Sequence, residues 1–192
     1  MNDDSSANAE LQPLVSVGIP TYSRPGGLRR TLECITGQTY GNLEIIVSDN
    51  ASPVNETESV MREFMAHDHR IQFYRQPENR GPLFNFQFVL EKASGEYFMW
   101  AADDDAWDTE FVETLMRQFQ LSDSSIVAIA SEAQYTVGGK PQPFFCEGAP
   151  FYSDLYDSAF ERIRHMLLFN YGNLFYSIFK KSSLSKNGRT VF

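Results

Sequence analysis

Short apolar runs alternate with amphipathic segments along the first two thirds of the chain. The apolar runs have the length of buried strands and lie at residues 14–19, 43–48, 71–75, 97–101 and 126–130. The segments between them space their apolar residues as helices do, at residues 26–36, 53–67, 83–93 and 108–119. This alternation predicts an α/β fold with a mostly parallel central sheet flanked by helices, Rossmann-like and with right-handed crossovers.

Three of the predicted helices carry further expectations. Ser52 followed by Pro53 predicts a helix N-cap with proline at the first helical position. Asp108 is expected to cap the helix that presents Phe111, Leu115 and Phe119 to the core. The helix at 83–93 is expected to bury one stripe of apolar side chains, Leu83, Phe86 and Leu90.

The regular alternation ends after residue 132. Residues 133–150 are rich in glycine and proline, and Gly138-Gly139 predicts a hairpin or loop. A helix at 154–169 and a strand near 174–179 are expected to follow.

Composition narrows the possible partners. Sixteen Lys and Arg against 25 Asp and Glu give a net charge of −9, which argues against nucleic acid as a partner. The two cysteines, Cys34 and Cys146, lie far apart and predict free thiols in a reducing compartment. The polar, acidic first twelve residues lack the pattern of a signal peptide, and no apolar run would span a bilayer. We expect a cytoplasmic protein, with peripheral contact at the inner face of the membrane left open.

Polar clusters follow four of the predicted strands. They are Pro20-Thr-Tyr-Ser23, Asp49-Asn50, Asn79-Arg-Gly81 and Asp103-Asp-Asp105. The carboxyl ends of parallel strands share one edge of the sheet, where open α/β folds bind ligands. The four clusters therefore predict one site.

The acidic triplet predicts a divalent cation at this site. Three adjacent carboxylates repel one another unless a cation is near, and Mg²⁺ or Mn²⁺ is often held by one or two carboxylates plus substrate phosphates. The alternative is a solvated acidic turn. Asp49 has a similar alternative as a simple turn residue, and Arg80 as a solvated arginine. His67 and His69 look like a metal-binding pair, but an exposed polar loop is favoured there.

The spacing of these clusters, together with Gly95-Glu-Tyr ahead of Ala102-Asp-Asp-Asp105, resembles family 2 of the inverting glycosyltransferases, whose members share the GT-A nucleotide-diphospho-sugar-binding fold. The match is good over 14–119 and looser over 126–192. The resemblance implies Mn²⁺ or Mg²⁺ at Asp104 and Asp105. It also implies a set of donor-binding residues: Pro20, Thr21, Tyr22, Arg24, Asp49, Asn79, Arg80, Gly81 and Asp103. Ala102 stands where the commoner motif has its first aspartate, and Asn85 and Gln87 fall on a further family segment with no clear role.

The resemblance implies transfer of a sugar from a UDP-, GDP- or dTDP-sugar to a glycan or lipid-linked acceptor, in surface polysaccharide synthesis. It divides the chain into a disordered acidic tail (1–12), a nucleotide-sugar-binding part (13–132) and the start of an acceptor-side part (133–192). Members usually carry the general base after the strand expected near 174–179, yet no Asp or Glu follows Glu161. We expect the base beyond Phe192, in a longer protein.

Two alternatives stay open. One is a non-catalytic nucleotide-sugar-binding fragment. The other is a sugar-phosphate nucleotidyltransferase, although the short Ser23–Gly27 segment does not match the longer glycine-rich loop that such enzymes carry after the first strand.

Overall fold

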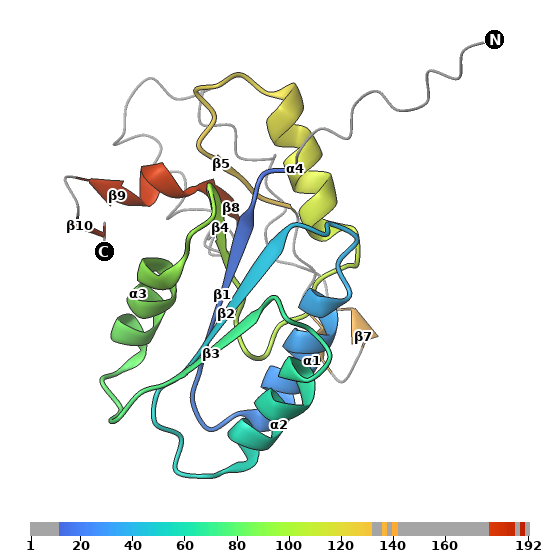
Figure 1. The fold of residues 1–192 in the computed structure, drawn as a ribbon. Coiled ribbons are helices and arrows are strands. Elements are labelled where there is room, and N and C mark those ends of the chain that lie inside the picture. Colours follow the sequence, from blue (N-terminus) through green and yellow to red (C-terminus); the bar gives the residue numbers. More distant parts are fainter. Residues whose placement is uncertain (1–11, 132–135, 138–139, 142–176, 187–188, 191–192) are drawn as a thin grey trace. The chain divides into compact units, whose positions relative to one another are not determined.

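The computed structural model describes residues 12–131, 136–137, 140–141, 177–186 and 189–190. Contacts divide the chain into two compact units, residues 1–129 with 178–192, and residues 130–177. The first unit holds the main sheet and the four α-helices of the described residues (Figure 1).

Strands and helices alternate in the first unit as the sequence predicts. Their order is β1 (Val15–Thr21), α1 (Pro25–Thr36), β2 (Leu43–Asp49), α2 (Glu56–Met65), β3 (Ile71–Arg75), α3 (Pro82–Lys92), β4 (Tyr97–Trp100), α4 (Phe111–Leu121) and β5 (Ala128–Ile129). Later in this unit come a strand β8 (Ile178–Lys180) and a 3-10 turn η3 (Lys181–Leu184). Two short paired strands, β9 (Ser185–Lys186) and β10 (Arg189–Thr190), follow the turn.

The main sheet has the order β3-β2-β1-β4-β8-β5. The first four strands are parallel, whereas β8 runs antiparallel to β4 and to β5. Strand order reverses between β1 and β4, because β2 and β3 lie on one side of β1 and β4 lies on the other. The sheet is therefore mostly parallel, as predicted, with its switch point beside β1.

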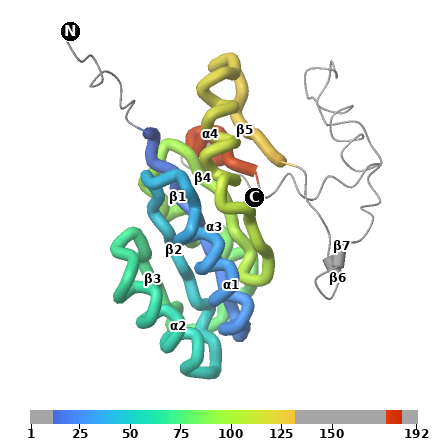
Figure 2. Tube along the Cα trace, turned by 90° about the vertical axis from the view of Figure 1, so that its right-hand side faces the viewer, coloured from blue at the N-terminus to red at the C-terminus, as the bar shows by residue number. Residues whose placement is uncertain are grey.

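Helices cover both faces of the sheet, with α3 on one face and α1 and α2 on the other (Figures 1 and 2). Alternate residues of each strand face opposite layers. Val15, Val17 and Ile19 of β1 join the core cluster that includes residues of α1, α2 and α4. A Cβ on Gly18, between them, would lie 2.7 Å from a Val89 methyl of α3, so glycine lets this helix approach the strand closely.

Three local expectations are wrong. The helix after β2 begins at Glu56 and ends at Met65, and Ser52 does not cap it because its side chain and backbone bond to Asp49 instead. The helix after β4 has Glu110 as its N-cap without a side-chain cap bond, and Asp108 contributes a backbone carbonyl, which accepts from the Phe111 N–H.

The third error concerns α3, whose Leu83 is 59% exposed. The buried face of this helix instead consists of Asn85, Val89 and Leu90. Asn85 can be buried because it accepts from Ser48 Oγ of β2, while Leu90 is buried as predicted.

The later segments fit the sequence more loosely. The fifth strand covers only Ala128–Ile129, and the strand expected near 174–179 is observed at Ile178–Lys180. In the second unit, β6 (Thr136–Val137) pairs antiparallel with β7 (Lys140–Pro141), as expected for a hairpin, while Gly138 and Gly139 themselves lie outside the described residues. The helix expected at 154–169 lies outside the described residues.

Candidate functional site

The carboxyl ends of β1, β2 and β4 meet at one edge of the sheet. Thr21, the last residue of β1, is in register with Asp49, the last residue of β2. The acidic triplet follows β4, which pairs with β1 on the other side of the switch point. The prediction that the clusters after β1, β2 and β4 share one edge is confirmed.

Helix α1 and strand β1 fix the backbone of the acidic triplet. Thr21 Oγ1 donates to Asp103 Oδ2 at 2.7 Å, and Thr31 Oγ1 lies 2.9 Å from the Ala102 carbonyl oxygen and 3.2 Å from that of Asp105. At Gly27 the helix comes so close that a Cβ there would lie 2.2 Å from the Asp103 carbonyl oxygen. The triplet is therefore a positioned loop and not a loose acidic turn.

Two residues of the triplet, Asp103 and Asp104, share a single guanidinium. Arg24 Nη1 lies 3.3 Å from Asp103 Oδ1 and also donates to Asp104 Oδ2. These charges raise the pKa of Arg24 above its ordinary value, chiefly through Asp103 and then Asp104. Burial raises the pKa of Asp103, against the lowering influence of the Thr21 hydrogen bond and of Arg24.

Asp105 is less well compensated than its neighbours. Burial of the carboxyl group raises its pKa, and the charges of Asp104 and Asp103 raise it further. Because Asp105 is exposed, we attribute its raised pKa mainly to repulsion by the two neighbouring carboxylates.

Asp105→Asn should therefore stabilise the metal-free protein at pH 7. A carboxyl group whose folded-state pKa is raised contributes most below its unfolded-state pKa, and that contribution is lost as the pH rises through the folded-state value. We expect a gain of only about 0.5 kcal/mol in the free energy of unfolding at pH 7, because solvent screens exposed charges. This gain should disappear below the ordinary pKa of 3.8.

Urea unfolding between pH 3 and 7 in the presence of a chelator measures this gain. Asp108→Asn is the matched control, since it removes an exposed carboxylate outside the triplet. A stability of Asp105→Asn that stays below the wild type at pH 7 would contradict the assignment of repulsion to this position.

Asp49 is completely buried at the end of β2. Its Oδ1 accepts from the Ser52 N–H at 3.0 Å and from the Ser52 hydroxyl, which in turn accepts from the Ser23 N–H at 2.8 Å. Its Oδ2 has no hydrogen-bond partner among the described residues, and Arg75 Nε lies 3.7 Å away. A buried carboxylate oxygen with an unused acceptor position is costly unless a ligand uses it.

Ser52 thus joins the loops that follow β1 and β2. Both loops contain a non-glycine residue with positive φ, Ser23 at 57° and Ala51 at 61°. Such residues carry a cost of about 1 to 3 kcal/mol each and are concentrated at ligand sites. The strain is consistent with loops shaped for binding.

Asn50 organises the loop before α3, a role that the sequence reasoning missed. Its Nδ2 donates to Asn79 Oδ1 at 2.9 Å and to the Gly81 carbonyl at 3.0 Å, and its Oδ1 accepts from the Arg80 N–H at 3.1 Å. Gly81 has a φ of 85°, which explains glycine there. The signal available in the sequence was an asparagine directly after a buried strand.

The remaining predicted residues differ in exposure. Tyr22 is 44% exposed, and Arg80 stacks on Phe84 with its guanidinium carbon 3.7 Å from the ring centroid. Pro20 is buried in β1. Asn85 is buried as well, and it accepts from Ser48 Oγ at 2.6 Å, which makes it a link between α3 and β2.

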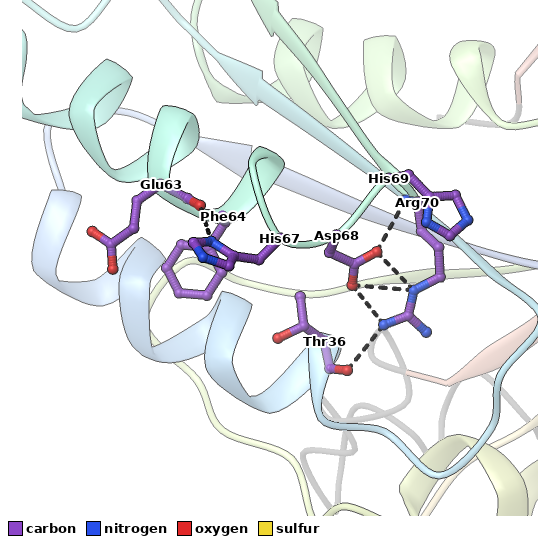
Figure 3. Close-up of a pocket in the computed structure, with 7 residues that line it drawn as sticks. All are labelled: Thr36, Glu63, Phe64, His67, Asp68, His69 and Arg70. Carbon is purple, nitrogen blue, oxygen red and sulfur yellow. Dashed lines mark hydrogen bonds and ion pairs between the residues drawn. The ribbon is translucent and has the colours of Figure 1, made fainter.

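A pocket of about 570 Å³ lies elsewhere, at the carboxyl end of α1 and around the His67–Arg70 loop (Figure 3). Arg70 binds the Asp68 carboxylate and the Thr36 carbonyl, and His67 Nδ1 lies 2.9 Å from the Glu63 carbonyl. Helix α1 contacts the triplet through Gly27 and Thr31, whereas it lines this pocket through its last residue, Thr36. His67 and His69 are exposed, in agreement with the exposed polar loop favoured from the sequence.

The sequence predicts a metal site among the described residues, and their helices show whether any of them could cross a membrane. No group of three or more His, Cys, Asp and Glu side chains in that part of the chain is arranged to hold a metal. Asp103 and Asp104 nevertheless bring two carboxylate oxygens to one cationic nitrogen, which is the donor set that suits a hard divalent ion completed by phosphates. No described helix is long and apolar enough to cross a bilayer.

Known proteins share this sequence pattern. A family model, Glycosyl transferase family 2, matches residues 16–175. The GalNAc(5)-diNAcBac-PP-undecaprenol beta-1,3-glucosyltransferase of Campylobacter jejuni is 30% identical over 176 residues, which cover 90% of this chain and 53% of that protein. Glycosyltransferase GlyA of Streptococcus pneumoniae is 30% identical over 78% of this chain and 20% of its own length. The chain therefore spans about half the length of the first relative and less of the second.

Solved structures share the fold. TarS 1-349 of S. aureus in complex with UDP-GlcNAc aligns with a TM-score of 0.66 and 22% identity, covering 88% of this chain and 46% of that one. Mannosyltransferase PcManGT from Pyrobaculum calidifontis, in complex with GDP-Man and Mn²⁺, aligns with a TM-score of 0.54 and 26% identity over 63% of this chain and 36% of that one.

Proposed function

Since this chain belongs to glycosyl transferase family 2, we propose that it binds a nucleotide-diphospho-sugar and contributes to inverting, metal-dependent transfer of the sugar to a glycan or lipid-linked acceptor. The observation that carries this proposal is the convergence of Asp103 and Asp104 on one cation at the switch point of the sheet. A cation placed there lies where open α/β sheets bind ligands.

Asp104, with Asp103 or Asp105 beside it, would hold Mn²⁺ or Mg²⁺. When bound, such an ion supplies positive charge that stabilises a diphosphate leaving group. The protein's own contribution is to fix the carboxylates in advance, through Thr21 on Asp103 and Thr31 on the triplet backbone. A relative of known structure holds both GDP-Man and Mn²⁺, which supports this assignment.

Asp49 is the residue we assign to the nucleobase. A carboxylate accepts hydrogen bonds, and Asp49 Oδ2 accepts none among the described residues, so it suits a base that offers an N–H donor. Uracil, thymine and guanine each offer a ring N–H. Solved structures with a similar fold hold UDP-GlcNAc or GDP-Man, which favours a UDP-, dTDP- or GDP-sugar. A base can reach Oδ2 only if the partly exposed Arg75 side chain shifts from its position 3.7 Å away.

The other predicted donor contacts have a supporting role in this proposal. Tyr22 and Arg80 are exposed beside the strand ends and can contact the nucleoside or the phosphates. Asn79 and Gly81 position the loop that carries Arg80, through Asn50. Pro20 and Thr21 are buried and shape the site from β1.

Inversion requires a general base that takes the proton of the acceptor hydroxyl as it attacks the anomeric carbon. The turn after β8 reads Lys-Ser-Ser-Leu and contains no carboxylate, and we assign no base in this chain. Surface polysaccharide synthesis at the cytoplasmic face of the membrane is the setting we propose, in line with a relative whose name includes a PP-undecaprenol-linked saccharide.

Calorimetry with UDP, GDP, dTDP and CMP, each with Mn²⁺ and with a chelator, tests the donor site. We expect metal-dependent binding of one nucleoside diphosphate, weakened at least about tenfold in Asp104→Ala, which corresponds to roughly 1.4 kcal/mol. Asp108→Ala, an exposed carboxylate on the same connection, should bind like the wild type. Absence of binding by a folded chain, or equal binding with chelator, would remove the proposal.

A further inference from the structure

Arg24 contacts Asp104, the first of the proposed metal ligands, together with Asp103, one of the two residues proposed to hold the metal beside it. It immediately precedes α1, and its Nη1 lies 3.3 Å from Asp103 Oδ1 while also donating to Asp104 Oδ2. One positively charged nitrogen thus sits between two carboxylates, in the place where a divalent cation would bind both.

The Asp103 carboxylate is buried and anchored, whereas the Arg24 side chain is largely exposed. Asp103 is buried and anchored by Thr21, and the triplet backbone is held by Thr31. The Arg24 side chain is 56% exposed, and its ion pair with Asp104 is open to solvent. Exposed ion pairs contribute about 0 to 1 kcal/mol, so this contact can be exchanged at little cost.

We propose that Arg24 is a built-in counter-ion that occupies the cation position between Asp103 and Asp104 and competes with the divalent metal for them. The inference rests on the proposed function, because that function assigns the metal to these carboxylates. In the metal-free protein Arg24 neutralises charges that would otherwise repel each other. It leaves them when the metal arrives, so the metal binds at the expense of the Arg24 contacts.

The competition accounts for an arginine directly before α1. A guanidinium released from the carboxylates is well suited to contact a diphosphate, since it forms paired hydrogen bonds with phosphate oxygens. Arg24 would thereby be a positioning residue that moves between the empty and the loaded site. A lysine there would keep the charge but lose the fork of donors.

The test is the affinity of the nucleotide-free protein for Mn²⁺, measured by calorimetry or by the paramagnetic resonance signal of free Mn²⁺. We expect Arg24→Gln to bind Mn²⁺ about fivefold more tightly than the wild type, as loss of a competing exposed pair allows. Arg29→Gln, in α1 and paired with Glu63, removes the same charge and should leave the affinity unchanged. Without metal, Arg24→Gln should unfold at a lower temperature than the wild type. Mn²⁺ should abolish this difference in unfolding temperature.

Equal or weaker Mn²⁺ binding by Arg24→Gln would overturn the inference, and so would an equal gain in Arg29→Gln or no Mn²⁺ binding by any variant. Nucleotide binding separates this result from the proposed function. If the wild type binds a nucleoside diphosphate with Mn²⁺ but Arg24→Gln shows no gain, the donor site stands and the counter-ion role fails. If Arg24→Gln gains Mn²⁺ affinity but no nucleotide binds, the counter-ion role stands and the donor site fails.

Discussion

Gly27→Ala is expected to lower the free energy of unfolding by about 1 to 3 kcal/mol and to weaken metal-dependent nucleotide binding more than about tenfold. A Cβ at this position would lie 2.2 Å from the Asp103 carbonyl oxygen, 3.3 Å from its carbonyl carbon and 3.6 Å from the Asp104 Cα. These are backbone atoms of a loop held by Thr31, so they cannot rotate away as a side chain would. Either α1 or the triplet must move.

Gly26→Ala is the control that the chain itself offers. The two glycines are adjacent in the first turn of α1, but a Cβ on Gly26 meets nothing within 4 Å. Alanine is up to about 1 kcal/mol more favourable than glycine inside a helix, so this variant should be neutral or slightly stabilised. Urea unfolding and calorimetry of both variants decide the matter. Equal stability and equal binding in the two variants would contradict the close approach at Gly27.

Glu44→Gln is expected to destabilise the protein by about 2 to 3 kcal/mol at pH 7. Glu44 is buried and accepts hydrogen bonds from the Ser16 hydroxyl, from the Ser94 hydroxyl at 2.9 Å and from the Ser94 and Gly95 N–H groups. A glutamine would place an NH₂ group against these donors or leave several of them without an acceptor. The carboxylate ties the loop before β4 to β1 and β2.

The effect of Glu44 should depend on pH. Burial acts to raise the pKa of this carboxyl, but the hydrogen bonds from Ser16, Ser94 and Gly95 outweigh it and lower the pKa below its ordinary value of 4.5. A group with a lowered folded-state pKa stabilises fully above its unfolded-state pKa and loses that contribution as the pH falls through the folded-state value. The difference between wild type and Glu44→Gln should therefore be largest near neutrality and shrink below pH 4.5.

Chemical denaturation at pH 7 and at several acidic values measures this dependence. Glu91→Gln is the matched control, since Glu91 is an exposed carboxylate on α3 and its replacement should leave stability nearly unchanged. A Glu44→Gln variant as stable as Glu91→Gln at pH 7 would show that the network contributes nothing net. A difference that grows towards acidic pH would contradict the lowered pKa.

The sequence located the acidic triplet, but it did not reveal which side chain lies against it. Adjacent carboxylates predicted a nearby cation, and the structure places one there, the guanidinium of Arg24. Arg24 was expected to contact the donor because the resemblance put it beside the nucleotide. Its partners Asp103 and Asp104 are separated from it by 79 and 80 positions in the sequence. No local pattern predicts a contact between residues so far apart.

Ser52 shows the same limit on a smaller scale. Serine before proline fits a helix N-cap by local propensity, yet its hydroxyl bonds to Asp49 and accepts from the Ser23 N–H across two loops. The closing of these loops over the strand ends outweighs a cap worth about 1 kcal/mol. The prediction that Leu83 is buried is wrong for a related reason. The hydrogen bond between the buried Asn85 and Ser48 decides which side of α3 faces the sheet.

The sequence by itself determined the alternation of strands and helices, the parallel core of the sheet and the edge at which polar residues gather. Those features follow from hydrophobic periodicity and from connection lengths, which are local properties of the chain. The tertiary structure alone decided that Asp49 keeps a buried oxygen without a hydrogen bond from the described residues, that Asn50 holds the Asn79–Gly81 loop, and that Gly27 must lack a side chain. Each depends on which distant segments the sheet order brings into contact, and this is settled only when strands, helices and loops pack together.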